Sequence, residues 1–156
     1  MYTATVQLKI DSFVPYSAGG KVAYQFTSLI PDSISGGVFS LSGTTITVKC
    51  PQGYTGSFQI IYQLQDPAHV LLGIAVKSTT AEKTTKVTSG RLQFPNVVVQ
   101  RDTGSSLMTV TDVTISGTAT FDYDILVQAT SMAKTPANQG KIGIIDPDID
   151  NEGGGE

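Results

Sequence analysis

The stretch "TATVQLKI", residues 3–10, decides the fold class of this chain. Its apolar residues Ala4, Val6, Leu8 and Ile10 alternate with threonine, glutamine and lysine. In an extended strand every second side chain lies on the same face, so this alternation predicts a half-buried β-strand.

The same period of two recurs as far as about residue 130, between turns rich in proline and glycine. The inward-facing rows that it predicts are Val22, Tyr24 and Phe26; Ile46, Val48 and Cys50; Phe58, Ile60, Tyr62 and Leu64; and Phe121, Tyr123, Ile125 and Val127. Turns spaced roughly 8–12 residues apart are typical of a sandwich. No window shows the 3.6-residue period of an amphipathic helix. We therefore predict an all-β, antiparallel β-sandwich of about eight or nine strands, immunoglobulin-like or jelly-roll.

Two stretches depart from simple alternation. "VLLGIAVK", residues 70–77, is almost continuously apolar, which predicts a strand covered on both faces with Gly73 at a bulge. "RLQFPNVVVQ", residues 91–100, contains Pro95, which cannot donate a hydrogen bond to a neighbouring strand. This run is predicted to be an edge strand or to bend at the proline.

The chain has the length of one domain, with 156 residues. Charged residues make up only 15% of it, against roughly 25% in an average globular protein. We predict a β-sandwich domain over residues 1–130, followed over 131–156 by a linker, a docking strand and an acidic C-terminal tail.

The charge distribution argues against nucleic acid as a partner. Five of the 13 acidic residues lie in the last eleven positions, so the remaining eight face all ten lysines and arginines. That balance leaves the body without the strong basic surface that nucleic-acid binding requires. The nearest basic cluster, Lys77, Lys83, Lys86 and Arg91, is expected to flank a solvated loop.

No membrane partner is predicted either, because no run of about 18 apolar residues is present. The N-terminal "MYTATVQLKID" lacks the pattern of a signal peptide. A cytoplasmic or particle-associated location is the resulting expectation.

The residues available for catalysis are few. His69 is the only histidine, with Asp66 three residues before it, but no serine stands in a G-x-S-x-G context. His69 is therefore predicted to be a solvent-side turn residue, and no catalytic residue, cofactor or enzymatic activity is predicted. The only cysteine, Cys50, is expected to be a small buried hydrophobe.

The closing "DPDIDNEGG" offers one hypothesis for a metal. Asp146, Asp148 and Asp150 alternate as the first three ligands of a calcium loop do. The glycine and glutamate that such a loop carries further on are missing, so a solvated acidic tail is the alternative.

The residues just before these acids favour an interaction. Ile142, Ile144 and Ile145 are too apolar for a freely solvated tail. We expect them to form a strand that docks on an open edge, within one chain or on a neighbour.

The last third of the chain resembles the DP-EP family of small bacterial proteins of unknown function. The matching motifs are "TVTD" at Thr109–Asp112, the pair Phe121 and Tyr123, and Asp146, Pro147, Ile149, Asn151 and Glu152 near the end. The chain departs from the family by closing with three glycines and Glu156 instead of a proline and an acid. The resemblance implies a small β-sandwich and no particular activity.

The sequence thus favours a non-enzymatic structural or interaction module that binds itself or another protein through strand edges or the C-terminal arm. The alternative is a ligand-binding sandwich for calcium, carbohydrate or both, supported by the terminal acids and six tyrosines.

Overall fold

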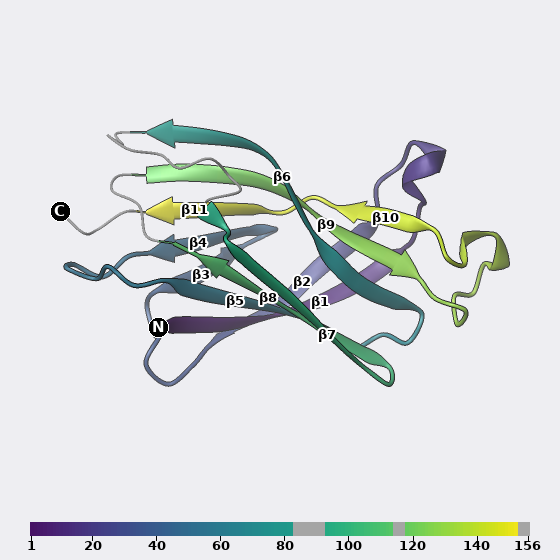
Figure 1. The fold of residues 1–156 in the computed structure, drawn as a ribbon, viewed down its shortest axis with the longest axis horizontal. Helices are drawn as coiled ribbons and strands as arrows, with labels where there is room; N and C mark the ends of the chain where they lie inside the picture. Colours follow the sequence, from purple (N-terminus) through teal and green to yellow (C-terminus); the bar gives the residue numbers. More distant parts are fainter. Residues whose placement is uncertain (83–92, 114–117, 153–156) are drawn as a thin grey trace.

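The computed structural model describes residues 1–82, 93–113 and 118–152. Two β-sheets face each other across a common core (Figure 1). Two short 3-10 helices, η1 (Tyr16–Ala18) and η2 (Pro136–Asn138), accompany the strands. The predicted all-β sandwich is confirmed.

The first sheet, sheet A, has five strands in the order β2-β1-β5-β8-β7. Their bounds are β1 Tyr2–Ser12, β2 Ala23–Pro31, β5 Phe58–Leu64, β7 Asn96–Asp102 and β8 Ser105–Asp112. Strands β2 and β7 form its two edges.

The second sheet, sheet B, has six strands, in which β9 lies between β6 on one side and β10 and β11 on the other. The order continues from β11 through β4 to β3. The bounds are β3 Phe39–Ser42, β4 Thr45–Lys49, β6 His69–Glu82, β9 Thr118–Ala129, β10 Ile142–Ile145 and β11 Asp148–Glu152.

Both sheets are mixed, although purely antiparallel sheets were expected. Strand β1 pairs in parallel with β5, and β11 pairs in parallel with β4. Each pair joins strands far apart in the sequence, whereas period-two alternation reports only which face a side chain occupies. The pattern therefore predicts the strands and leaves their partners and directions open.

The C-terminal segment is built into sheet B. Strand β11 lies between β9 and β4, and β10 continues the same line along β9 (Figure 1). The segment docks on its own chain. Strand β11 takes an interior position of the sheet, whereas β10, which among the described strands pairs only with β9, lies at an edge. Residues 131–141, predicted as a linker, form the loop between β9 and β10.

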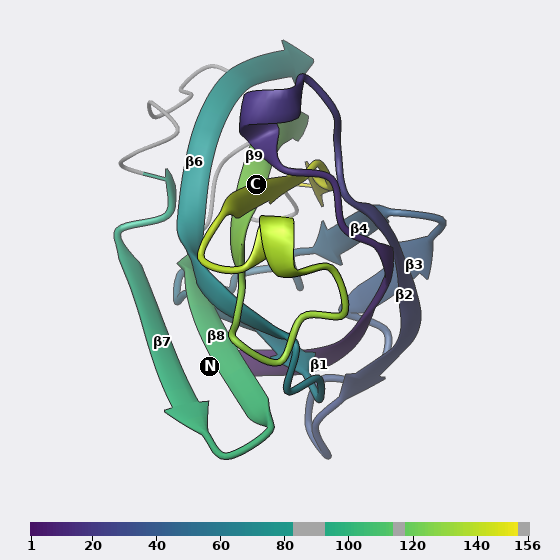
Figure 2. The ribbon, with the colours of Figure 1, turned by 90° about the vertical axis from the view of Figure 1, so that its right-hand side faces the viewer.

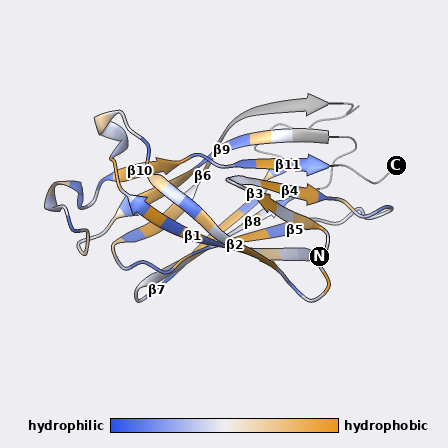
Figure 3. Cartoon of the chain, turned by 180° about the vertical axis from the view of Figure 1, so that it is seen from behind, coloured by the Kyte–Doolittle hydropathy of each residue, from blue (hydrophilic) through white to orange (hydrophobic). Residues whose placement is uncertain are grey.

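The core lies between the sheets and comes from the predicted inward rows. Orange and blue bands alternate along several strands in Figure 3, as a half-buried strand requires. All four members of the row on β9 are fully buried, and Cys50 is buried as predicted. Asp124, from the opposite face of β9, is also largely covered.

The two atypical stretches occupy sheet edges. The apolar stretch around Gly73 forms part of β6, which among the described strands pairs only with β9. Most of residues 70–75 are partly exposed, so the stretch is not covered on both faces as predicted. The predicted irregularity at Gly73 is confirmed by a register shift between Leu71 and Gly73. Strand β7 begins directly after Pro95 and is an edge strand, as the proline predicted. Figure 2 shows β6 passing beside β9, and it also contacts β7 and β8.

Some predictions concern residues outside the described ranges. Lys83, Lys86 and Arg91 of the basic cluster lie there, as do the last four residues, 153–156. Within the described ranges, the chain has no helix of the length and apolarity needed to cross a lipid bilayer.

Candidate functional site

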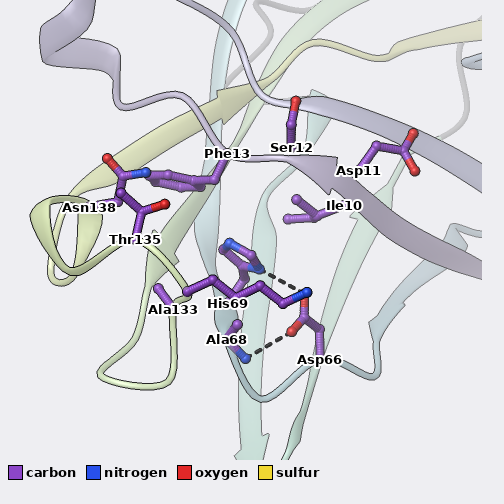
Figure 4. Close-up of a pocket in the computed structure, with 11 residues that line it drawn as sticks. Ile10, Asp11, Ser12, Phe13, Asp66, Ala68, His69, Ala133, Thr135 and Asn138 are labelled. Atoms are coloured by element: carbon purple, nitrogen blue, oxygen red, sulfur yellow. Dashed lines mark hydrogen bonds and ion pairs between the residues drawn. The ribbon is translucent and has the colours of Figure 1, made fainter.

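One candidate site is a pocket of about 440 Å³ at one end of the sandwich (Figure 4). Three segments distant in sequence build it: residues 10–13 at the end of β1, the turn 66–69 between β5 and β6, and the loop 133–138 between β9 and β10. Small-molecule sites commonly have volumes from about 300 to 1,000 Å³, so the pocket is large enough for a small ligand.

The centre of this pocket is a carboxylate–imidazole pair. His69 Nδ1 lies 2.7 Å from Asp66 Oδ2, and the backbone N–H of Ala68 donates to Asp66 Oδ1 at 2.8 Å. Pro67 breaks the strand pattern, so the aspartate can cap the turn and hold the ring at once. In neutral His69 this contact places the proton on Nδ1, which leaves Nε2 with a free lone pair.

The surroundings hold the ring in place. The side chain of His69 is only 14% exposed, and Phe13 stacks on it with ring centroids 5.3 Å apart and an interplanar angle of 25°. The loop after β9 is tied to the turn, because Thr130 donates from its hydroxyl to the carbonyl of Pro67 and from its N–H to that of Ala68. The pocket is therefore formed before any ligand arrives.

One sequence prediction about this region was wrong. His69 was expected on the solvent side of its turn, and this was wrong, because the ring is packed under Phe13 and bonded to Asp66. Ser12 lines the same pocket, but its hydroxyl points away from His69 in Figure 4. The arrangement provides a hydrogen-bond acceptor at Nε2 and no aligned serine nucleophile.

Of the three predicted metal ligands, Asp146 lies in the short connection between β10 and β11, and Asp148 and Asp150 lie on β11. Asp148 and Asp150 alternate on an extended strand, so they share one face about 7 Å apart along the backbone instead of converging as in a loop. Asp150 accepts a hydrogen bond from Thr120 at 3.0 Å, and Asp146 forms an ion pair with Lys21 at 2.5 Å. Among the described residues, no group of three or more histidine, cysteine, aspartate or glutamate side chains is arranged to hold a metal ion.

The two acids nearest β2 affect a neighbouring tyrosine. Burial raises the pKa of Tyr24 to about 12, and the negative charges of Asp146 and Asp148 act in the same direction. A hydrogen bond with Thr44 opposes the increase. The start of the acidic segment is therefore packed against the sandwich, in contact with its side chains.

The three predicted interaction residues have different environments. Ile145 is fully buried in the core, whereas Ile142 remains 45% exposed. Ile144 is partly buried, and its carbonyl accepts a hydrogen bond from the backbone N–H of Val22 at 3.1 Å. The isoleucines are used for docking within the chain itself.

A second polar cluster, which was not predicted from the sequence, lies inside the core. Asp112 on β8 of sheet A is fully buried and accepts hydrogen bonds from Gln93 at 2.5 Å and from Asn151 of β11 at 3.0 Å. Burial raises the pKa of Asp112 to about 7, although both hydrogen bonds act in the opposite direction. Burial raises the pKa of Tyr62 well above its usual value, and the carboxyl of Asp112 acts in the same direction.

This cluster joins the two sheets and two of the motifs noted in the sequence. The aspartate that ends "TVTD" and the asparagine near the C-terminus meet in one hydrogen bond. In the sequence, Asp112 and Asn151 are each a polar residue at an inward position of a strand. Because they lie 39 residues apart, no feature of the sequence indicated that they pair.

No protein-family model matches this chain, and no curated protein matches it.

Proposed function

We propose that this chain is a non-enzymatic interaction module that associates with a second copy of itself through the open edge formed by β7. The observation that carries the proposal is the contrast between β7 and the other edge strands. Strand β7 pairs with β8 over seven residues without any shift in register. Among the described strands, none pairs with its other side.

The other edges have features that oppose further pairing. Strands β2 and β6 each show two register shifts against their neighbours. Strands β3 and β10 are only four residues long each. Bulges and short length are the usual protection of sheet edges, because both disturb the row of backbone groups that a new strand would need.

The side chains of β7 also suit association. Residues 96–100 carry no charge, and Val98 is 54% exposed on the outer face of sheet A. The charged residues Arg101 and Asp102 stand only at the end of the strand. An exposed, regular and uncharged edge is a template for a further strand.

The outer face beside this edge has the same character. Fourteen side chains across its middle rows are uncharged, and interface centres are depleted of charge in the same way. They are Thr3, Thr5, Gln7, Ser28, Ile30, Gln59, Ile61, Gln63, Asn96, Val98, Gln100, Leu107, Thr109 and Thr111.

The C-terminal arm is a weaker candidate for the contact. Strand β11 occupies an interior position of its sheet, and β10 has only four residues and already accepts a hydrogen bond from the N–H of Val22 at the carbonyl of Ile144. Pairing through β7 needs no rearrangement of the described strands. Two copies related by a twofold axis would align their β7 strands antiparallel, which places the two Val98 side chains close together.

Sedimentation equilibrium of the wild type, Val98→Lys and Ile30→Lys tests the proposal. The wild type should dimerise as its concentration rises to the millimolar range, and Val98→Lys should be monomeric because two ammonium groups would meet in the pair. Ile30→Lys is the matched control, because Ile30 is 58% exposed on the opposite edge of the same face.

A second measurement locates the contact. Cys50 is buried, so Val98→Cys introduces the accessible thiol, and mild oxidation should link two copies faster than in Ile30→Cys. A wild type that stays monomeric at millimolar concentration, or a dimer that survives Val98→Lys, would show that β7 is not the interface.

A further inference from the structure

The pocket around His69 has a chemical character that the edge-pairing function does not use. It lies at the end of the sandwich where β1 finishes and β6 begins, and β7 contributes none of its lining residues. A binding site there would operate independently of association through β7.

The first argument concerns the hydrogen bonds of the Asp66–His69 pair. Capping the turn requires only Oδ1, which accepts the N–H of Ala68. The second oxygen orients the imidazole and selects its tautomer, so that Nε2 is a fixed acceptor. In Figure 4 this nitrogen points away from Asp66, toward the side on which Thr135 and Asn138 are drawn.

The second argument concerns charge. Asp66 is engaged with His69, and Asp11 accepts a hydrogen bond from Gln25 at 3.0 Å and lies 3.6 Å from Lys9. Lys134 adds one positive charge to the lining. Because acids and a base line the pocket together, a strongly charged ligand would meet a like charge whichever sign it carried.

The third argument concerns the rest of the lining. Thr135 and Asn138 offer groups that both donate and accept, and Ile10, Phe13 and Ala133 supply apolar surface. A ligand that satisfies all of these needs several hydroxyl groups around a partly apolar ring. Sugars have that combination, because each hydroxyl both donates and accepts while the ring hydrogens pack on carbon.

We propose that this pocket binds a small, neutral, polyhydroxylated ligand of the monosaccharide class, with His69 Nε2 as a hydrogen-bond acceptor for one hydroxyl. Asp66 acts as the positioning residue that keeps the acceptor at Nε2. Phe13 stacks on the imidazole ring of His69 and fixes its position.

Nitrogen-15 NMR of the imidazole tests the proposal directly, because His69 is the only histidine, so both ring signals belong to it. Their couplings to the two carbon-bound ring protons distinguish Nδ1 from Nε2. The probes are glucose, galactose, mannose, xylose and N-acetylglucosamine, each added to the full chain at up to tens of millimolar. At least one should shift the Nε2 signal in a saturable manner and leave the Nδ1 proton on its carboxylate.

Two variants separate binding from folding. His69→Phe keeps a ring against Phe13 but removes the acceptor, and it should weaken binding of the responding sugar about tenfold, as expected for one hydrogen bond. Asp66→Asn retains an oxygen for the N–H of Ala68 but loses the carboxylate, so it should bind less tightly with an altered tautomer signal. Both should keep the far-UV spectrum of the wild type.

Three results would overturn the proposal. One is that no probe moves the Nε2 signal, and a second is that His69→Phe, folded, binds the responding sugar as tightly as the wild type. The third is that zinc chloride shifts Nε2 while no sugar does, because the site would then bind a metal ion. Failure of the dimer experiments on Val98 leaves all three readouts unaffected.

Discussion

Replacement of Asp112 by asparagine should remove a large part of the pH dependence of folding stability. The buried carboxyl has a pKa of about 7 in the folded protein, against a reference value of 3.8. One pKa unit corresponds to about 1.4 kcal/mol of differential stabilisation, so the difference amounts to roughly 4 kcal/mol. Asp112→Asn keeps an oxygen for the donors on Gln93 and Asn151 and cannot ionise.

The sign follows from proton binding. Between pH 4 and pH 7 the folded state holds the proton on Asp112 and the unfolded state does not, so raising the pH favours unfolding. The contribution to stability is fully present below about pH 3.8, falls by about 1.4 kcal/mol per pH unit up to about pH 7, and is then constant. The measured quantity is the free energy of unfolding of Asp112→Asn minus that of the wild type. This difference should be roughly 4 kcal/mol larger above pH 7 than at pH 4.

Urea denaturation followed by tyrosine fluorescence and far-UV circular dichroism provides the measurement, since the chain has six tyrosines and no tryptophan. Subtracting the wild type from the variant at each pH cancels the titration of all other groups. Asp11→Asn, on the exposed end of β1, is the matched control and should run nearly parallel to the wild type. If the Asp112→Asn difference stayed within about 1 kcal/mol across this range, the carboxyl would be well solvated and the buried-cluster reasoning would be refuted.

Two further predictions concern the C-terminal strands, and thermal or urea unfolding checks both. Ile149→Ala should cost about 2–5 kcal/mol because this side chain is fully buried, whereas Ile142→Ala, at a half-exposed position, should change stability by about 0.5 kcal/mol or less. Equal effects would mean that β11 is not part of the core. Gly143→Ala should cost about 1–3 kcal/mol, since an added Cβ would lie 2.5 Å from a methyl of Val22, while Gly36→Ala, which meets nothing within 4 Å, should be close to neutral. An unchanged midpoint for Gly143→Ala would show that β10 can move away from its neighbour.

Much of the fold could be predicted from local pattern. Alternation identified the inward rows on β1, β5 and β9, and Pro95 identified an edge. Alternation is a property of single strands, so it could not predict that β1 pairs in parallel with β5 or that the terminal segment fills a place between β9 and β4.

The candidate site was less predictable for a related reason. Asp66 and His69 stand three residues apart, and their pairing was open to a sequence argument. The pocket around this pair is completed by Phe13, near the start of the chain, and by the loop 133–138, near its end. Only the sheet arrangement brings those segments together.

The C-terminal strand shows how one residue can hide a pattern. Ile149 and Asn151 face the core, and Asp148 and Asp150 face outward, which is the same period of two that marks β1. Asparagine at an inward position breaks the apolar row in the sequence, so the acids stand out and suggest a metal loop. The structure supplies the compensation, because Asn151 donates to Asp112 across the sheets.

That hydrogen bond also argues for one register of the terminal strand. A slip by one residue would turn Asp148 and Asp150 toward the core and Ile149 toward solvent, since side chains alternate strictly between the two faces. Burying unpaired carboxylates costs several kcal/mol, and the slip would also remove the donor that Asp112 uses. The buried pair of Asp112 and Asn151 therefore specifies the register of β11, whereas an isoleucine in place of Asn151 would add only apolar burial. Loss of the pair should lower stability and also allow β11 to dock out of register.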